Sequence, residues 1–207
     1  MGAIKTLAGL QKKIEKTGGS GNTFLTLKDG DSYQIRFLQE LSEDAKNYNE
    51  DRGTAELVAV HTNPINFRRK MACTAETGAC WACEQIGDNP KWRATNHLLI
   101  NVAYKDGGDF KVGIVDTTFS KAKIGDSMVE CASEFGSLTS KYYKFKRTGA
   151  KMNDTAYTLM GLSDAPEDDG VTEPLNDLTT VYKVVPYEQQ EEWLTKEEVA
   201  NAKADSW

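Results

Sequence analysis

Three cysteines within eleven residues, with a histidine upstream, are the part of the sequence best suited to chemistry. His61, Cys73, Cys80 and Cys83 give the spacing H-x11-C-x6-C-x2-C. Zinc prefers four sulfur or nitrogen ligands in a tetrahedron, and a C-x2-C pair on a tight turn supplies two of them with little loss of entropy. In a reducing compartment such a cluster indicates metal ligands rather than disulfides. The sequence therefore predicts one structural Zn²⁺ in a Cys3His site.

Two further residues compete for a place in this site. His97 lies in a strand-like run, where a partly buried structural imidazole is the commoner fate of a histidine. Cys131 lies on the apolar side of a predicted helix, which favours a small core residue over a ligand. His61 is preferred because it precedes the cysteines on a strand that enters the same knuckle.

The pattern around the cysteines argues against catalysis by the metal. Zinc deaminases combine H-x-E with P-C-x-x-C, and metalloproteases use H-E-x-x-H. Here Thr62 and Asn63 follow His61, and no proline precedes Cys80. The chain also lacks a recognisable Ser/His/Asp grouping, a P-loop and a G-x-G-x-x-G. We therefore expect a closed site and no enzymatic activity, since a zinc nuclease or deaminase needs an open coordination position.

Basic and aromatic residues alternate repeatedly along the chain, and no acidic residue occurs from 57 through 75. Lysine and arginine neutralise phosphates, and exposed aromatic faces stack on unpaired bases at about 1–3 kcal/mol each. This interleaving favours binding of a single nucleic-acid strand. The candidate contacts are Arg36, Arg68, Arg69, Lys70, Lys91, Trp92, Arg93, Tyr104, Lys111, Phe119, Lys121, Lys123, Tyr142, Lys144 and Lys146.

Strand alternation separates surface candidates from core residues, because successive side chains of a strand point to opposite faces. In the KYYKFKR run, Phe145 shares a face with the second tyrosine, and Lys144 and Lys146 share the other face. The second set is the better candidate for nucleic acid. By the same alternation, Arg36 is a candidate contact and Phe37 a core residue.

The net charge of −6 is unevenly distributed along the chain. Residues 1–160 hold 22 basic and 19 acidic residues, a charge of +3, whereas residues 161–207 hold 3 basic and 12 acidic residues, a charge of −9. An acidic chain would ordinarily argue against a nucleic-acid binder. A basic body can nevertheless hold phosphates, and an acidic segment can imitate them. We expect the segment from 164 to 207 to modulate binding and to dock partners.

Hydrophobic periodicity predicts a mainly β, α+β chain whose short strands form a small barrel. A Gly/Ser linker follows a basic amphipathic helix, so residues 1–21 form either a mobile N-terminal arm or a surface helix packed on the domain. Asp-Gly at 29–30 signals a hairpin. The expected elements are strands at 24–27, 33–38, 57–61, 96–104, 110–115, 142–147, 156–162 and 181–185, a helix at 120–135 capped by Gly136, and a short helix from a capping box at 195–198.

Composition and hydropathy set the broad class. An apolar fraction of 39% excludes a wholly disordered chain, and 207 residues can bury a real core. No apolar run approaches the roughly 20 residues that span a bilayer. The N-terminus also lacks the apolar stretch and cleavage site of a signal peptide. We therefore expect a cytoplasmic protein without a membrane partner.

Taken together, these segments resemble the zinc-containing single-stranded-DNA-binding proteins of bacteriophages, of the T-even helix-destabilising type. The likeness covers roughly residues 22–163, and its most specific element is the order of one histidine and three cysteines. The other matching segments are FLTLKDGD at 24–31, NHLLINVAY at 96–104, YKFKRTG at 143–149 and NDTAY at 153–157.

The resemblance implies a five-stranded OB-fold with an inserted zinc subdomain at about 57–95. It also implies that a basic, aromatic-lined cleft binds single-stranded DNA during phage replication, recombination and repair, in the cytoplasm of the infected bacterial host. Proteins of this kind contact neighbouring copies through a basic N-terminal arm. Their acidic C-terminal segment docks replication or recombination proteins. Trp207 has no matched counterpart in these phage proteins, and it is a candidate anchor here because bacterial single-strand-binding proteins end in an acidic run and an aromatic residue.

Two other functions fit the same residues. A zinc-knuckle adaptor would use the acidic segment to recruit proteins, with nucleic acid incidental. An RNA-binding module would use the same cations and rings on a different strand. Binding of oligo-dT at two salt concentrations separates a DNA binder from an adaptor, because phosphate contacts make affinity fall as salt rises.

Overall fold

The computed structural model describes residues 23–106, 109–151, 154–166 and 170–196. Within these residues seven strands form one sheet in the order β3-β2-β4-β1-β6-β7, and β5 pairs with β4 outside that path. The elements are β1 (Ser32–Phe37), β2 (Glu56–Thr62), β3 (Lys70–Ala72), α2 (Trp81–Glu84), η1 (Pro90–Trp92), β4 (Thr95–Asp106), β5 (Asp109–Thr118), α3 (Gly125–Phe135), β6 (Lys141–Thr148), β7 (Ala156–Asp164), η2 (Leu178–Thr180) and α4 (Tyr187–Thr195).

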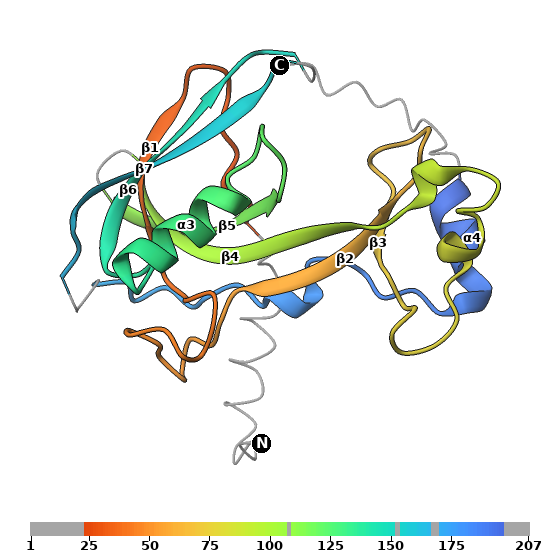
Figure 1. Ribbon diagram of the computed structural model, residues 1–207, viewed down its shortest axis with the longest axis horizontal. Coiled ribbons are helices and arrows are strands. Elements are labelled where there is room, and N and C mark those ends of the chain that lie inside the picture. Colours follow the sequence, from red (N-terminus) through yellow and green to blue (C-terminus); the bar gives the residue numbers. More distant parts are fainter. Residues whose placement is uncertain (1–22, 107–108, 152–153, 167–169, 197–207) are drawn as a thin grey trace, which may run out of the picture.

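Strand β4 joins the two parts of the molecule. Along one edge it pairs with β5 from His97 to Asp106. Along the other edge it pairs first with β2 and then, from Val102 to Tyr104, with β1. The sheet therefore divides, and β1 leads into a β-body (residues 23–55 and 96–166) while β2 leads into a cysteine lobe (residues 57–95 with α4). Figure 1 shows the β-body on the left and the cysteine lobe on the right.

The main core lies between one face of the sheet and α3. Ile100 and Val102 of β4 alternate into it, Tyr143 of β6 meets them, and Met128 of α3 covers them. Helix α3 ends as the sequence predicts, because Gly136 adopts a φ of 71°. It begins only at Gly125, where a Cβ would lie 2.7 Å from the carbonyl oxygen of Thr118, so the glycine allows close packing.

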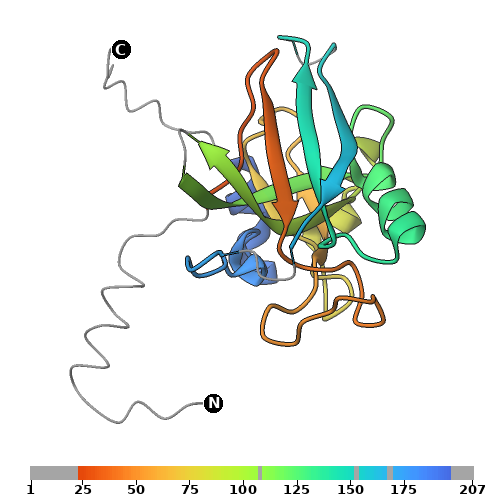
Figure 2. The same ribbon diagram turned by 90° about the vertical axis from the view of Figure 1, so that its left-hand side faces the viewer.

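A strap of the C-terminal region, residues 170–186, covers the opposite face of β4 and β5. Leu178 packs on Leu99 and Ile114, while Val171 and Leu175 pack on a neighbouring cluster of the same face. Figure 2 shows α3 and the strap on different sides of the strands. This part of the acidic segment from 164 onward, which was expected to modulate binding and to dock partners, is therefore built into the fold.

The strap then carries α4 onto the cysteine lobe. Val185 and Leu194 are buried against Met71 and Ala82, which forms a second, smaller core. Within the described residues no helix is long and apolar enough to cross a membrane.

Several predicted elements are confirmed. Strands β2, β4, β5, β6 and β7 lie where periodicity placed them, with β4 paired to β5 and β6 to β7, and helix α3 forms the later part of the helix expected at 120–135. Alternation was also correct in β6, where Tyr143 and Phe145 are buried and Lys144 and Lys146 are exposed.

The predicted N-terminal hairpin does not form. Phe24 makes a parallel bridge with Ile114 of β5, whereas β1 pairs with β4 and β6. The turn itself is present, with Gly30 at a φ of 83°. Its N–H group donates to the carbonyl oxygen of Arg147, so the turn directs the chain onto β6 rather than back along its own preceding strand. The sequence therefore predicts the turn at Gly30 correctly, but it predicts the wrong partner strand for β1.

The sheet is open in the described residues, since its path ends at β3 and at β7. The α+β class is confirmed, while the closed five-stranded barrel is not. No strand forms at 181–185, although the N–H of Ala72 in β3 donates a hydrogen bond to the carbonyl oxygen of Lys183. Thr195, the first residue of the predicted capping box, is the last residue of α4, and the remainder of the predicted terminal helix lies outside the described residues. The N-terminal arm and Trp207 lie outside the described residues.

Candidate metal centre and basic surface

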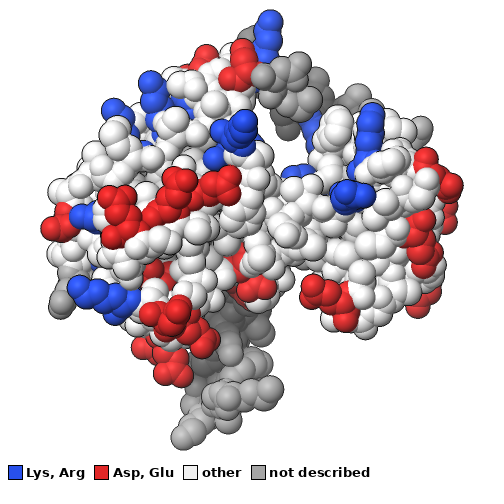
Figure 3. Space-filling model, in the orientation of Figure 1, with Lys and Arg blue, Asp and Glu red and all other residues white. Residues whose placement is uncertain are grey.

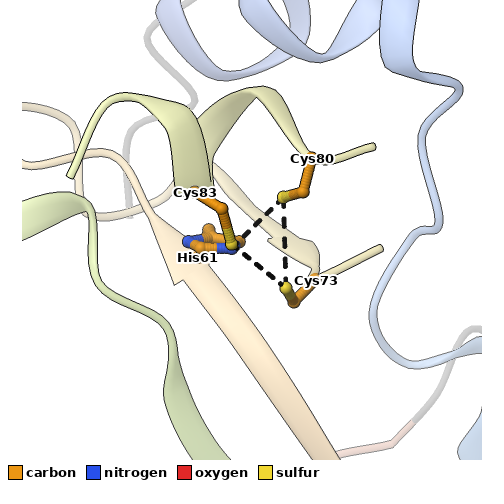
Figure 4. A group of neighbouring side chains, drawn as sticks. All are labelled: His61, Cys73, Cys80 and Cys83. Carbon is orange, nitrogen blue, oxygen red and sulfur yellow. Dashed lines mark hydrogen bonds between the residues drawn. The ribbon is translucent and has the colours of Figure 1, made fainter. Parts of the chain in front are cut away.

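The four predicted ligands meet in the cysteine lobe. Nε2 of His61 lies 3.4 Å from Sγ of Cys80 and 3.3 Å from Sγ of Cys83. Sγ of Cys73 lies 3.6 Å from that of Cys83 and 4.0 Å from that of Cys80. All four ligand atoms lie within 4.8 Å of one another. Figure 4 shows the imidazole and the three thiols converging on one point, as the ligands of a single ion do.

Two short strands and a turn position these ligands. His61 lies near the end of β2 and pairs in register with Met71 of β3. Cys73 comes directly after Ala72, the last residue of β3. The N–H of Cys73 donates to the carbonyl oxygen of Ala59 at 2.7 Å. Beyond it, Thr74 holds the turn, because its Oγ1 donates to the carbonyl oxygen of Ala79 at 2.7 Å.

The first turn of α2 supplies the other two thiols. Cys80 is the N-cap residue of α2 and Cys83 lies within the helix, which brings both thiols to the same side. The N–H of Glu84 donates to the carbonyl oxygen of Cys80, closing this turn. The C-x2-C pair is thus placed by local backbone geometry, as the spacing predicts.

A hydrogen bond to the backbone orients the imidazole of His61. Its Nδ1 lies 2.6 Å from the carbonyl oxygen of Trp92, to which a protonated Nδ1 donates. That bond leaves Nε2 as the unprotonated ligand atom that faces the thiols. A backbone carbonyl is a usual hydrogen-bond partner for the other ring nitrogen of a metal-binding histidine. Trp92, predicted as a base-stacking residue, is half-buried and packs edge-on against Trp81 with ring centroids 5.3 Å apart. In this structure Trp92 therefore supports the centre.

The electrostatics of the cluster favour a bound cation. Burial lowers the pKa of the His61 imidazole, which keeps it in the neutral form that ligates metals. Burial and the neighbouring thiols raise the pKa of Cys83 to about 12. Thiols packed so closely cannot all ionise unless a positive ion neutralises them. The four residues are therefore compatible with a single structural metal ion.

The two competing residues lie elsewhere. His97 is only 8% exposed, and its Nδ1 lies 2.6 Å from Oδ1 of Asp116. The phenol of Tyr182 donates to the same carboxylate. Asp116 of β5 therefore joins His97 of β4 to Tyr182 of the strap. Cys131 packs at the edge of the main core on α3. Both outcomes agree with the structural roles that the sequence favoured.

Comparison with known proteins returned no match to a family model, to a curated protein or to a solved structure. The site must therefore be understood from its own geometry.

The predicted nucleic-acid contacts fall into three groups by burial. Arg36 is buried. The half-buried group is Arg69, Lys70, Trp92, Tyr104, Lys123 and Tyr142. The exposed group is Arg68, Lys91, Arg93, Lys111, Phe119, Lys121, Lys144 and Lys146.

Arg36 is the one predicted contact that is buried among the described residues. Its side chain is 5% exposed, and its Nε donates to the carbonyl oxygen of Thr139 at 3.2 Å. Alternation correctly predicts that Arg36 and Phe37 point to opposite faces of β1. At this point both faces of the strand are buried. Little of its guanidinium is left to meet a phosphate.

Half-buried cations lie over aromatic rings on both sides of the boundary between the β-body and the cysteine lobe. Nζ of Lys70 lies 5.8 Å from the ring centroid of Tyr182 in the strap. Nζ of Lys123 lies 4.6 Å from the ring centroid of Tyr157, and the guanidinium carbon of Arg147 lies 6.0 Å from it. We call these five residues the cationic track. Figure 3 shows the surface hollowed between the two parts, with lysine and arginine side chains on both sides of the hollow.

A further aromatic site continues from the track onto α4. Nζ of Lys183 lies 4.1 Å from the ring centroid of Trp193, and the guanidinium carbon of Arg69 lies 5.5 Å from it. The indole N–H of Trp193 donates to the carbonyl oxygen of Lys70, which ties this site to the track. A depression of about 300 Å³ opens beside Arg69 and Trp193.

The structure does not bring all the predicted cations together. Arg147 lies on the same side of β6 as the buried Phe145, whereas Lys144 and Lys146 lie on the opposite, exposed side. Across that side they pair in register with Met160 and Thr158 of β7. The β6 lysines and the cationic track are therefore two separate surfaces.

Acidic side chains occupy another face. Asp126, Glu130 and Glu134 follow one another at helical spacing along α3, and all three are exposed. Figure 3 shows this acidic row across the front of the β-body. This exposed face of α3 is therefore acidic.

Sequence reasoning missed several residues of the basic surface. The candidate contacts omitted Tyr157 and Arg147, although both fall within segments that carry the resemblance. They also omitted Tyr182, Lys183 and Trp193, because the C-terminal quarter was treated only as an acidic segment. The adjacent aromatic and lysine at 182–183 was the signal available there.

Proposed function

We propose that this protein binds single-stranded DNA along the cationic track, largely without sequence specificity and without enzymatic activity. The observation that carries the proposal is the convergence of Lys70, Lys123 and Arg147 with the rings of Tyr157 and Tyr182 across the boundary of the two parts. Phosphates need cations and unpaired bases need aromatic faces, and here the two kinds of group alternate.

The electrostatics of the track support a polyanionic ligand. Burial lowers the pKa of Lys123, and the charges of Arg147 and Lys70 lower it further, while Asp116 opposes the shift. Three cations are thus close enough to disfavour one another. A chain of phosphates would relieve this repulsion and release its own counterions on binding.

We propose that the ion of the metal centre is zinc. With Zn–S bonds of about 2.3 Å and a Zn–N bond of about 2.0 Å, the edges of a tetrahedron are about 3.8 Å between sulfurs and about 3.5 Å between sulfur and nitrogen. Four of the six edges of the cluster fit these lengths, at 3.6 and 4.0 Å between sulfurs and 3.3 and 3.4 Å between sulfur and nitrogen, and all six lie within 4.8 Å. Four protein ligands would close the site, so the zinc would hold the lobe together rather than activate water.

The biological setting rests on the resemblance to phage single-stranded-DNA-binding proteins. On that basis we propose that the curved sheet of the β-body is an open relative of the OB-fold. The protein would coat and protect unpaired DNA during phage replication, recombination and repair in the host cytoplasm. Neighbouring copies would meet through the N-terminal arm, and replication or recombination proteins would dock on the acidic C-terminal segment.

Titration of a fluorescent oligo-dT at low and at high salt tests the binding function. We expect tight binding at low salt, weaker binding at high salt, and weak binding of duplex DNA. Lys70→Ala and Lys123→Ala should each weaken binding and reduce the salt slope by about one. Lys144→Ala removes the same charge from the opposite side of β6 and should have a smaller effect. Equal affinity for duplex, or no salt dependence, would contradict the proposal, and preference for oligo-rU would assign the surface to RNA.

A further inference from the structure

The turn between β2 and β3 holds two large apolar side chains in solvent. Ile65 is 92% exposed and Phe67 is 59% exposed, and Ile65 is the most exposed large apolar residue that the structure describes. We call residues 63–69 the tip. Figure 1 shows this turn at the top of the cysteine lobe. Single exposed apolar residues are common on proteins, but two in one short turn need a reason.

The tip is a hydrogen-bonded frame. Oδ1 of Asn63 accepts from the N–H groups of Ile65, at 2.6 Å, and of Asn66, at 2.9 Å. Oδ1 of Asn66 accepts from the N–H of Arg68 at 3.1 Å. The N–H of Asn63 donates to the carbonyl oxygen of Arg69, which closes the turn. The frame sets the backbone independently of the two apolar side chains.

The frame is also anchored to the rest of the lobe. Asn63 is buried, and its Nδ2 donates to the carbonyl oxygen of Leu194 in α4 at 2.6 Å. Ile65 and Phe67 are therefore presented on a supported turn, the arrangement that a contact surface requires.

The charge around the tip identifies its partner. Arg68 and Arg69 follow Phe67 directly, Lys70 comes next, and no acidic residue occurs from 57 through 75. Lys70 belongs to the cationic track, and Arg69 lies over Trp193. Apolar side chains that continue a row of phosphate-binding cations suit a ligand with an anionic backbone and apolar faces. An unpaired nucleic-acid strand has both.

We propose that the tip is a base-contacting wedge, in which Phe67 stacks on an unpaired base and Ile65 packs against its neighbour where the strand leaves the cationic track. This inference rests on the proposed function, because the strand reaches the tip only by following the track. It adds a contact that reads bases rather than phosphates, and so strengthens binding at every salt concentration alike.

Paired probes test the wedge. Phe67→Ala and Ile65→Ala should each weaken binding of oligo-dT, with the phenylalanine variant losing roughly tenfold, the size of one base–aromatic stack. The salt slope should stay at the wild-type value, since no phosphate contact is removed. An oligonucleotide of the same length built of abasic residues keeps the phosphates and lacks the bases. The wild type and both variants should bind that probe equally.

The control variant is Met160→Ala, an equally apolar truncation at an exposed residue of β7 on the side of the β6 lysines. It should bind both probes as the wild type does. Unchanged melting temperature and zinc content would show that the tip variants remain folded.

Each other outcome assigns a different cause. If the wild type does not bind oligo-dT, or binds it with an affinity that does not fall as salt rises, the proposed function itself is wrong. If the wild type binds and Phe67→Ala binds oligo-dT equally well, the wedge alone is wrong. Equal losses on the two probes would overturn the wedge in favour of an indirect effect. If the tip variants lose binding to anionic vesicles but still bind oligonucleotides as the wild type does, the wedge is overturned in favour of a membrane-binding surface.

Discussion

Gln190 of α4 and Trp81 of α2 are 109 residues apart, yet Oε1 of Gln190 accepts the backbone N–H of Trp81 at 2.8 Å. Trp81 stands between the two cysteines of the C-x2-C pair. Nε2 of Gln190 donates to Oγ1 of Thr74 and to the carbonyl oxygen of Val185. One fully buried amide thus fastens the C-terminal helix to both ends of the loop that carries the thiols.

Replacing Gln190 should therefore weaken the metal centre without removing a ligand. Gln190→Leu keeps the volume but leaves the N–H of Trp81 buried without its acceptor, which costs about 1–3 kcal/mol of unfolding free energy. Urea denaturation of the metal-loaded protein measures this loss, and a chelator assay should show faster release of the metal. Gln189→Leu alters the exposed neighbour and should change neither quantity. Equal behaviour of the two variants would contradict the role of Gln190.

Removing a thiol should release the metal. Cys83→Ser or Cys80→Ser should lower the zinc content below one ion per chain and lower the melting temperature, because a structural zinc contributes folding free energy directly. Elemental analysis and calorimetry measure the two effects. Cys131→Ser on α3 lies outside the cluster and should keep its zinc. A melting temperature unchanged in Cys83→Ser would refute a structural ion at this site.

The polar contact between strap and sheet should make stability depend on pH. Burial raises the pKa of Asp116, but hydrogen bonds from His97 and Tyr182 outweigh burial and hold that pKa below its usual value of 3.8. Because the folded pKa is the lower one, the carboxylate stabilises the fold above about pH 4, and this contribution is lost as pH falls through the folded pKa.

The variant Asp116→Asn isolates this contribution. It should unfold at lower urea than the wild type near neutral pH, and the gap between them should narrow as the pH falls below about 4. Acid also releases the metal from both proteins, so the gap is the quantity to follow. Tyr182→Phe removes one of the bonds and should give a smaller gap that narrows in the same window. A gap that stays constant with pH would contradict the assignment to Asp116.

The strap changes how the acidic segment must be tested. Ending the chain before residue 164 removes Leu178 and Leu194, and so exposes the apolar face of β4 and β5 and the core of the lobe. We expect that truncation to lower the melting temperature sharply. Ending it after residue 196 removes only the last eleven residues, which carry three acidic side chains and one basic one.

The shorter truncation should keep the melting temperature. If the last acidic residues compete with DNA for the cationic track, it should also tighten binding of oligo-dT at low salt, and less so at high salt. Titration of both chains at the two salt concentrations measures this. Unchanged affinity at low salt would mean that these residues do not compete.

The sequence alone determined those features whose cause is local. The ligands His61, Cys73, Cys80 and Cys83 could be chosen from spacing, because a short β-ribbon and one helical turn bring them together. Hairpins such as β4 and β5 follow from a turn with glycines between two apolar runs. Alternation in β6 correctly separated Phe145 from Lys144, because it depends only on the pleat of one strand.

Only the tertiary structure decided which surfaces meet. Phe24 bridges β5 instead of β1, and Arg36 is covered on the face that alternation assigned to solvent. The acidic C-terminal quarter contributes Leu178 to the outer face of the sheet, and Tyr182 to the cationic track. Periodicity shows that an apolar or cationic face exists, but its partner is chosen by long-range burial. For that reason the cluster of His61 and the three cysteines could be predicted from the sequence, whereas the basic surface required the fold.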